Sequence, residues 1–329
     1  MSNKNTLYSL IFTGTLLLLV FLFKTDSDAK NVLSYQENIK NTSLEASTQI
    51  ISLIPTSQIF PQKKETNNNF ALEIKSEESK PFKKQNIQEP ILSSKIIFVK
   101  DLENNKELFG LGIEKYWPIA SITKLLTAIV ALEKINQNET ISISQTSIDT
   151  EGIAGNFSVN EKYFIKDLIK IMLTVSSNDA ASVISEFYGQ ENFINEMNLK
   201  AKEIGMSQTK FYDCSGLSIQ NKSTANDLTE LAEYIIKEKP EILEYTRAKE
   251  LSVLELSKNS NKFFTNINFF AGREDFIGGK TGFIESSEQN LLSIFNYKDH
   301  KILIIILGSN DRYLDTQKIL DWIKVSYSF

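Results

Sequence analysis

The order of the expected elements predicts an α+β fold, in which an antiparallel β-sheet with flanking helices carries an inserted, mostly helical subdomain. Strand-like apolar runs lie at the start and at the end of the globular part of the chain. Between them, from Ser121 to about Pro240, apolar residues recur at three- and four-residue steps, as in amphipathic helices. A sheet drawn from both ends of the chain around a helical block is an α+β arrangement.

The composition excludes several classes of protein. The 329 residues are 41% hydrophobic, enough for a sizeable domain, and the net charge is −5 without a dense basic block, so nucleic acid is not expected as a partner. One cysteine, Cys214, and one histidine, His300, cannot build a disulfide framework or a structural zinc site. We expect no cofactor and no metal, although a purely carboxylate site stays possible.

Three regions are expected. Residues 7–23 carry no charge and reach the short end of the ~17–25 residues that span a bilayer. We therefore expect 1–23 to be a retained membrane anchor, with a cleaved signal peptide as the alternative and Ser27-Asp28-Ala29 as a weak cleavage site. Lys4 favours a cytoplasmic amino terminus, which would place the remainder outside the cytoplasm as a single-pass protein of the cell membrane.

A polar tether is expected at residues 24–94, which are rich in Asn, Ser, Lys, Glu and Gln. As a flexible coil it would span roughly 45–50 Å. The apolar stretch 50–60, "IISLIPTSQIF", would either contact lipid or form a short element.

The globular domain is expected at residues 95–329. "KIIFVKDLENNKELF" predicts a hairpin that turns at residues 103–105. "EKYFIKDLIKIMLTV" and "ENFINEMNLKAKEIGM" predict helices, the second ending at Gly205. "DFIGGKTGFIE", "QNLLSIFNY" and "KILIIILG" predict three neighbouring antiparallel strands, and "DTQKILDWIKVSY" predicts a closing helix packed on that sheet.

Ser121 and Lys124 lie one helical turn apart, so their side chains share a face. A serine hydroxyl needs a base to become a nucleophile, and a lysine can serve only if burial or a second cation lowers its pKa. The same spacing occurs at Ser27 and at Ser207, but only Ser121 opens a strongly apolar helix, whose N–H groups could face an oxyanion. The alternative is that Ser121 caps the helix and Lys124 is a surface lysine.

Two further short motifs could complete such a site. Ser176 and Asn178 flank Ser177 at an expected break between helices, although the same pattern at 158–160 and 257–259 makes a helix cap the alternative. Lys280-Thr281-Gly282 is the only such tripeptide and lies on a predicted strand, where it offers a cation and a hydroxyl. Its glycines would admit a substrate backbone, or would merely weaken the strand. His300 lies in a polar break and is expected to be a solvated turn residue, so a serine–histidine pair is not expected.

These three motifs, in this order, resemble those of the serine D-alanyl-D-alanine carboxypeptidases, the low-molecular-weight penicillin-binding proteins. The likeness extends to "WPIASITKLLTAIVALE", "LIKIMLTVSSNDAASVISE", "FYDCSGLS" and "FIGGKTGF". It implies a β-lactamase/transpeptidase-like fold, acyl transfer on a peptidoglycan stem peptide, and β-lactam antibiotics as covalent inhibitors.

The resemblance also implies a role for each residue. Ser121 would attack the penultimate D-Ala carbonyl, Lys124 would take its proton and Ser176 would protonate the departing D-Ala. The remaining residues would bind substrate: Asn178 its amide, Lys280 and Thr281 its carboxylate, and Gly282 and Phe283 its backbone, with the N–H groups of Ser121 and Phe283 as the oxyanion hole. Lys280 would also help to keep Lys124 neutral.

The sequence departs from that family in places. Ser177 stands where a glycine is usual, and Cys214, where a proline is common, is interpreted as a structural thiol. The β-rich C-terminal domain of many relatives is not expected, and the N-terminal segment would take over the anchoring. Two alternatives stay open: a class A-like β-lactamase, whose ExxxN spacing Glu191 and Asn195 fit, and a non-catalytic wall-binding homologue.

Overall fold

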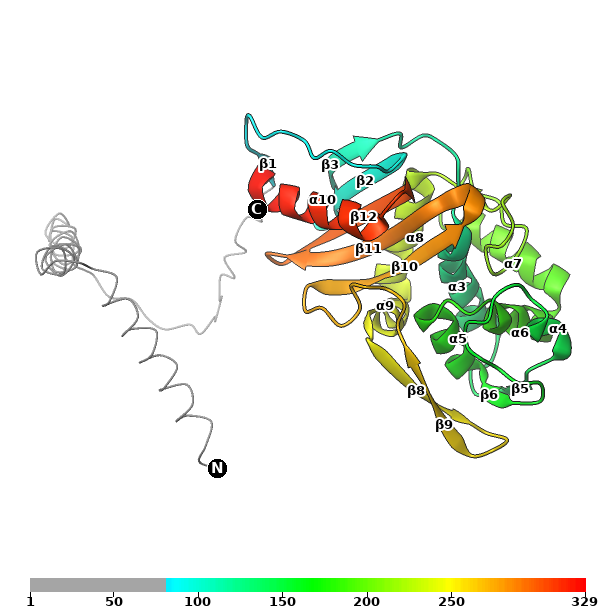
Figure 1. Ribbon diagram of the computed structural model, residues 1–329. Helices are drawn as coiled ribbons and strands as arrows, with labels where there is room; N and C mark the ends of the chain where they lie inside the picture. The colour runs from blue at the N-terminus through cyan, green and yellow to red at the C-terminus, as the bar shows by residue number, and fades with distance from the viewer. Residues whose placement is uncertain (1–80) are drawn as a thin grey trace, which may run out of the picture. The chain divides into compact units, whose positions relative to one another are not determined.

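The structure, a computed structural model, describes residues 81–329, and its centre is a five-stranded antiparallel sheet (Figure 1). Every neighbouring pair in the sheet is antiparallel, which confirms the predicted hairpin, the three consecutive strands and the α+β class. In spatial order the strands are β10 (Phe276–Ile284), β11 (Glu288–Tyr297), β12 (His300–Ser309), β2 (Ile96–Asp101) and β3 (Lys106–Leu111). The sheet therefore joins both ends of the domain and leaves β10 at one edge.

Both faces of the sheet are covered, which explains why β12 is an almost continuous apolar run. Ile302, Ile304 and Ile306 pack with the closing helix α10 (Arg312–Ser326), confirming the predicted helix on the sheet. The alternate residues Leu303, Ile305 and Leu307 pack into the core of the helical subdomain. Because successive side chains of a strand point to opposite faces, β12 contributes to two separate cores.

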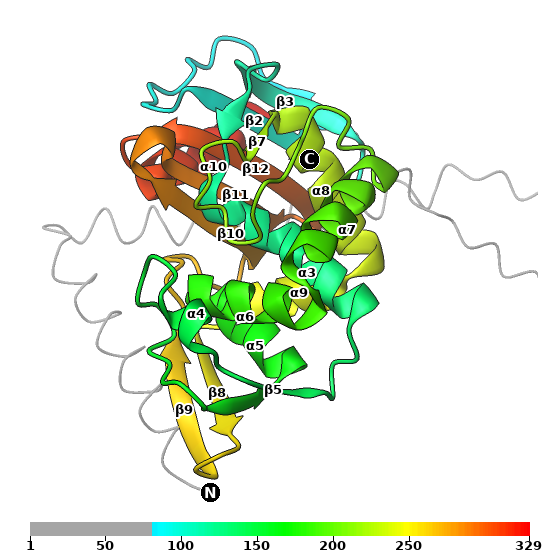
Figure 2. The ribbon, with the colours of Figure 1, turned by 90° about the vertical axis from the view of Figure 1, so that its right-hand side faces the viewer.

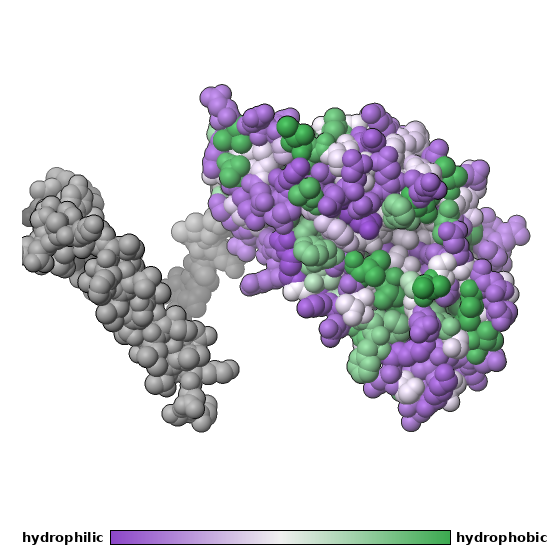
Figure 3. All heavy atoms as spheres, viewed as in Figure 1, coloured by the Kyte–Doolittle hydropathy of each residue, from purple (hydrophilic) through white to green (hydrophobic). Residues whose placement is uncertain are grey.

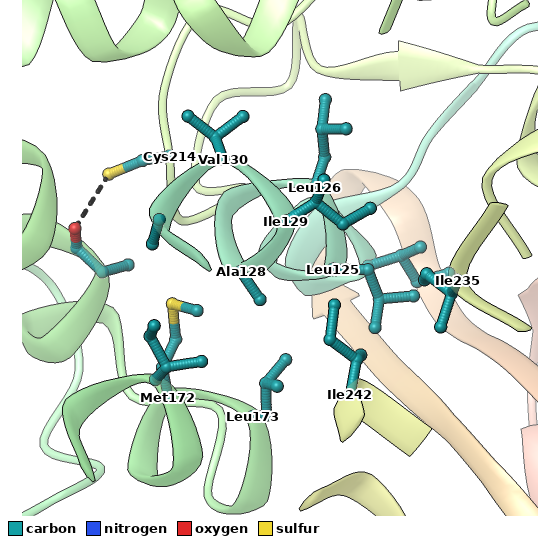
Figure 4. Close-up of a cluster of buried hydrophobic side chains, with 14 of the residues drawn as sticks. Leu125, Leu126, Ala128, Ile129, Val130, Met172, Leu173, Cys214, Ile235 and Ile242 are labelled. Atoms are coloured by element: carbon teal, nitrogen blue, oxygen red, sulfur yellow. Dashed lines mark hydrogen bonds between the residues drawn. The ribbon is translucent and has the colours of Figure 1, made fainter. Parts of the chain in front are cut away.

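The helical subdomain is built around one buried helix, α3 (Lys124–Lys134). Figure 4 shows its apolar side chains surrounded by Met172, Leu173, Ile235 and Ile242, which come from three other helices. Figure 2 shows this subdomain beside the sheet, with the β8–β9 hairpin extending from it. The other helices of the subdomain are α4 (Gln145–Ile148), α5 (Ile165–Thr174), α6 (Asn178–Tyr188), α7 (Gln190–Glu203), α8 (Ala225–Glu238) and α9 (Pro240–Arg247).

Short strands interrupt and flank the predicted helical block. Part of "EKYFIKDLIKIMLTV" forms β6 (Lys162–Phe164), which pairs with β5 (Thr140–Ser142), and only the remainder is helical. The hairpin of β8 (Glu250–Glu255) and β9 (Ser260–Thr265) follows α9, and β4 (Trp117–Pro118) pairs with β7 (Lys222–Ser223). Gly205 follows Ile204, the C-cap residue of α7, with φ +95°, and its N–H donates to the Lys202 carbonyl, so it ends that helix as predicted.

Residues 81–94, which the sequence assigns to the tether, contact the domain. β1 (Phe82–Lys83) pairs with β13 (Tyr327–Ser328), and Ser93 and Ser94 donate hydrogen bonds to the buried Asp315 carboxylate at 2.7 and 2.6 Å. Within 81–329 no helix has the length and hydrophobicity needed to cross a bilayer. The predicted anchor at 1–23 and the tether up to residue 80 lie outside the described residues.

Candidate active site

Ser121 lies on a single 3₁₀ turn, η1 (Ala120–Thr123), wedged between the sheet and the helical subdomain. Strand β10 passes so close that a Cβ on Gly282 would lie 2.6 Å from the Ile119 carbonyl and 3.3 Å from the Ser121 nitrogen. Only glycine permits this approach. Ala120 has a left-handed backbone, φ +48°, which is a strained conformation of the kind that clusters at functional sites.

The Lys124 amine is the centre of the site. Its Nζ lies 2.9 Å from Ser121 Oγ, 2.6 Å from Asn178 Oδ1 and 2.6 Å from the Ser215 carbonyl oxygen. The side chain is fully buried, and Ser121 makes no capping hydrogen bond to η1 or α3. The alternative of a helix cap beside a surface lysine is therefore wrong.

Burial lowers the pKa of Lys124 to about 7, and the negative charge of Asp213 offsets only part of that effect. The resemblance implies that the second cation, Lys280, lowers this pKa, whereas the lowering comes from desolvation. Near neutral pH a substantial fraction of the amines is thus uncharged. An uncharged amine has a lone pair, which a general base requires.

The loop that holds Lys124 was missed from the sequence. Asp213 accepts hydrogen bonds from the N–H groups of Ser215, Gly216 and Ser218, and this fixes the loop that presents the Ser215 carbonyl to Lys124. Asn221 joins the loop to η1 through its bond to Thr123 Oγ1 at 3.2 Å. The only available signal was "FYDCSGLS", where an aspartate precedes a serine and a glycine as in many turns.

The three residues of the Ser-x-Asn motif have different roles. Ser177, not its neighbours, caps α6 by accepting a hydrogen bond from the Ala180 N–H at 3.2 Å. The flanking residues are thereby left for the site: Asn178 contacts Lys124 and donates to the Glu151 carbonyl, while Ser176 adopts φ +60°. The helix-cap interpretation is correct for the middle serine alone.

Lys280, which lies on β10, forms the wall of the site opposite Lys124. Its Nζ lies 2.8 Å from Ser176 Oγ and 2.9 Å from the Thr281 carbonyl, and both Lys280 and Thr281 are buried. Burial, then the charges of Lys124 and Arg312, hold the pKa of Lys280 well below its usual value. The substrate-free site therefore disfavours the ammonium form of Lys280. Arg312, unassigned from the sequence, donates to the Gly282 carbonyl at 2.7 Å and so lies beside this strand.

The remaining candidate residues differ in whether they lie at the site. Phe283 lies on β10, an edge strand with unpaired backbone groups, and its side chain is 60% exposed. Glu191 and Asn195 lie exposed on α7 and make no contact with Ser121 or Lys124. The β-lactamase alternative therefore lacks its glutamate in the site.

Two further expectations concern His300 and Cys214. His300 is not a solvated residue, because it contacts the buried Asp101 carboxylate at 3.0 Å. Cys214 is buried against the Ala181 carbonyl, and burial raises its pKa to about 11, so it is a neutral thiol (Figure 4). No cluster of three or more His, Cys, Asp or Glu residues in the described part of the chain could hold a metal ion.

Comparison with known proteins adds independent information. Residues 83–311 match the family model described as D-alanyl-D-alanine carboxypeptidase. A D-alanyl-D-alanine endopeptidase from Escherichia coli is 30% identical over 250 residues, covering 72% of this chain and 79% of that protein, and one from Haemophilus influenzae is 34% identical over 221 residues, covering 65% and 74%. The solved structure of a Listeria monocytogenes penicillin-binding protein in its ampicillin-bound form is 27% identical, with a TM-score of 0.63, and the match covers 72% of this chain and 100% of that one.

Proposed function

The chain belongs to the D-alanyl-D-alanine carboxypeptidase family of serine peptidases, and we propose that it removes the terminal D-Ala from peptidoglycan stem pentapeptides through an acyl-enzyme at Ser121. β-Lactam antibiotics would acylate the same serine, as covalent inhibitors. No cofactor takes part in this mechanism, which uses only groups of the chain and water.

The acceptors around Lys124 support its role as the base. Asn178 Oδ1 and the Ser215 carbonyl can only accept hydrogen bonds, so an uncharged amine donates both of its hydrogens to them. Its lone pair then faces the Ser121 hydroxyl, 2.9 Å away. As Ser121 Oγ bonds to the substrate carbonyl carbon, its proton passes to Lys124. This arrangement is the observation that carries the proposal.

The opposite wall would serve the leaving D-Ala. Its carboxylate, placed beside Lys280 and Thr281, would favour the ammonium form of Lys280 because an opposite charge raises the pKa of an amine. Asn178 would hold the substrate amide. When the C–N bond breaks, Ser176, which is hydrogen-bonded to Lys280, would hand a proton to the departing nitrogen. Ser176 would regain a proton from the Lys124 ammonium, which returns Lys124 to its uncharged form for the second step.

Backbone donors would stabilise the oxyanion between these walls. The N–H groups of Ser121 and Phe283 are the candidates, because β10 passes within van der Waals reach of η1 at Gly282. Each such donor is typically worth about 3–4 kcal/mol of barrier. Water would then attack the ester, with Lys124 again accepting the proton, and release Ser121.

A fluorescent penicillin, followed by mapping of the labelled peptide, tests the nucleophile. We expect a long-lived adduct at Ser121 and D-Ala release from a pentapeptide, with both absent in Ser121→Ala. Ser207→Ala is the matched control, because Ser207 is exposed, belongs to the same Ser-x-x-Lys spacing and lies outside the site. Label retained by Ser121→Ala would contradict the proposal, and rapid penicillin turnover would favour a β-lactamase.

A second candidate activity is endopeptidase cleavage. It is favoured by the two curated relatives reported above, which carry that name. Both reactions use one acyl-enzyme and differ only in the amine that leaves, so the nucleophile and the base would be the same.

We also propose that residues 1–23 anchor the protein in the cell membrane and hold the catalytic domain outside the cytoplasm. The uncharged stretch 7–23 supports this, together with a substrate class found in the cell wall. Membrane fractionation combined with external protease tests it. Recovery of the full-length chain in the cytosolic fraction would contradict it.

A further inference from the structure

The edge strand β10 is supported by one short helix of the subdomain, α9, which lies beside it (Figure 1). The approach is close, because a Cβ on Gly278 would lie 2.8 Å from Thr246 Oγ1 and 3.0 Å from Leu243 Cα. A side chain at this position would force the helix and the strand apart. The last turn of α9 is therefore packed against the residues that precede Lys280.

Thr246 makes a polar contact across this junction. Its side chain is buried, and its hydroxyl oxygen accepts a hydrogen bond from the Gly279 N–H at 3.1 Å. The same hydroxyl donates to the Leu243 carbonyl at 3.1 Å. Its hydrogen is thus directed back into α9, which leaves a lone pair of the oxygen turned toward β10.

The contact lies on the open side of β10. Along an antiparallel strand, the N–H groups point alternately toward the neighbouring strand and away from it. The Gly279 N–H is bonded to a helix and so points away from β11, and the unbroken register that follows directs the N–H groups of Thr281 and Phe283 the same way. Of these three groups, within the described residues, only that of Gly279 donates to a side chain. The edge is therefore occupied at Gly279 and open from Thr281 onward.

The open part of the edge coincides with the groups that the proposed function assigns to the substrate. Thr281, together with Lys280, would bind the terminal carboxylate, and the Phe283 N–H would face the oxyanion. The Phe283 side chain is exposed, and Figure 3 shows hydrophobic residues on the face where the sheet meets the helical subdomain. A peptide that runs along β10 would thus have its carboxylate next to Gly279.

The end of α9 is itself held in place. Asn266 Nδ2 donates to the carbonyl oxygens of Thr246 and Ala248, both at 2.9 Å. The last turn of the helix therefore cannot shift without breaking these hydrogen bonds. Because Gly279 directly precedes Lys280, a helix end that holds Gly279 also fixes the backbone from which the Lys280 side chain enters the site.

We infer that Thr246 is a positioning residue for the substrate carboxylate, which it serves by holding Gly279. Through Gly279, its hydroxyl places Lys280 and Thr281 where that carboxylate binds. The inference rests on the proposed function, since it concerns how the same substrate is recognised. Thr246 does not contact the substrate itself. Its effect therefore lies in the discrimination between ligands with and without a carboxylate, and not in a uniform loss of activity.

The test compares a penicillin with its methyl ester, which lacks the carboxylate, on the full-length protein. The ratio of the two second-order acylation rate constants measures recognition of the carboxylate. Thr246→Val keeps the shape of the side chain but leaves the Gly279 N–H without its acceptor. We expect this ratio to fall about tenfold, because a small displacement of a binding group can cost that much.

Two further variants serve as controls. Thr246→Ser keeps the hydroxyl, so its ratio should stay within about twofold of the wild-type value. Thr229→Val removes a hydroxyl that is also buried but donates to the Ala225 carbonyl within α8, and it should likewise keep the wild-type ratio. Should Thr246→Val be unstable, Thr246→Ala takes its place. Rate constants are compared because they do not depend on how many molecules are folded.

An unchanged ratio in Thr246→Val, whether or not both rates fall, would overturn the inference, because the hydroxyl would then only stabilise the fold. A wild type that forms the Ser121 adduct equally fast with both compounds would overturn it as well, since there would be no carboxylate recognition to support. Failure of the proposed function looks different, because the wild type would then form no adduct at Ser121 with either compound.

Discussion

Lys124 Nζ lies 2.9 Å from Ser121 Oγ, and the lysine is fully buried while making no direct contact with a carboxylate. Its other two partners are carbonyl oxygens, which orient the amine without supplying negative charge. Burial therefore disfavours the ammonium form, and the same partners aim the lone pair at the serine. One arrangement accounts for both the base and the activated hydroxyl.

Removal of the amine should stop acylation while preserving the fold. In Lys124→Met we expect the second-order rate of penicillin acylation to fall by about 10²–10⁴, the usual contribution of a general base. Lys210→Met, in the exposed Ser207-x-x-Lys210 sequence, should react at the wild-type rate. Stopped-flow fluorescence gives the rates. A Lys124→Met protein that acylates normally would show that another group takes the proton.

The charge of Asp213 should affect the pKa of Lys124 without direct contact. Its charge raises the pKa of Lys124, opposing burial, so Asp213→Asn should lower that pKa. Acylation requires the uncharged amine, so the rate rises with pH through the pKa, and the midpoint in the variant should lie below the wild-type value of about 7. Rate–pH profiles measure this shift. A midpoint displaced to higher pH would contradict the electrostatic role.

Gly282 should be required for the approach of β10 to η1. The methyl group of Gly282→Ala would lie 2.6 Å from the Ile119 carbonyl, closer than van der Waals contact allows, so the two elements must separate. If the oxyanion donors lie at this contact, the acylation rate should fall by at least about tenfold, because a lost donor costs 10²–10³. Kinetics with penicillin and a thermal melt provide the measurements. Wild-type acylation in a stable variant would place the donors elsewhere.

Asp315 should stabilise the fold without affecting catalysis. Its buried carboxylate accepts hydrogen bonds from Ser93, Ser94 and Ser309, which hold its pKa below the ordinary value. Asp315→Asn should lower the free energy of unfolding by about 1–3 kcal/mol. The depressed pKa means that this stabilisation is present above pH ~4 and is lost as the pH falls through the folded-state value. Urea titrations at pH 7 and pH 3 check both points, and a deficit that persists unchanged at pH 3 would contradict the charge-based account.

The sheet could be predicted from the sequence because its strands are long, apolar and separated by polar breaks, and because Ser121, Ser176 and Lys280 each belong to a recognisable triplet. What could not be predicted depends on tertiary contacts. The sequence predicts a helix at β6 because three residues reveal no period, and this strand exists only by pairing with β5. The Ser215 carbonyl and Arg312 escaped notice because a backbone acceptor has no residue signature and an isolated arginine has no motif.

The most direct test of the account is the titration of the Lys124 amine itself, followed by nitrogen-15 NMR on protein labelled at lysine and assigned with Lys124→Met. We predict that its Nζ titrates near pH 7. An amine that is still fully protonated at pH 9 would have no lone pair to offer Ser121 at the pH of catalysis, and the proposed mechanism would be wrong.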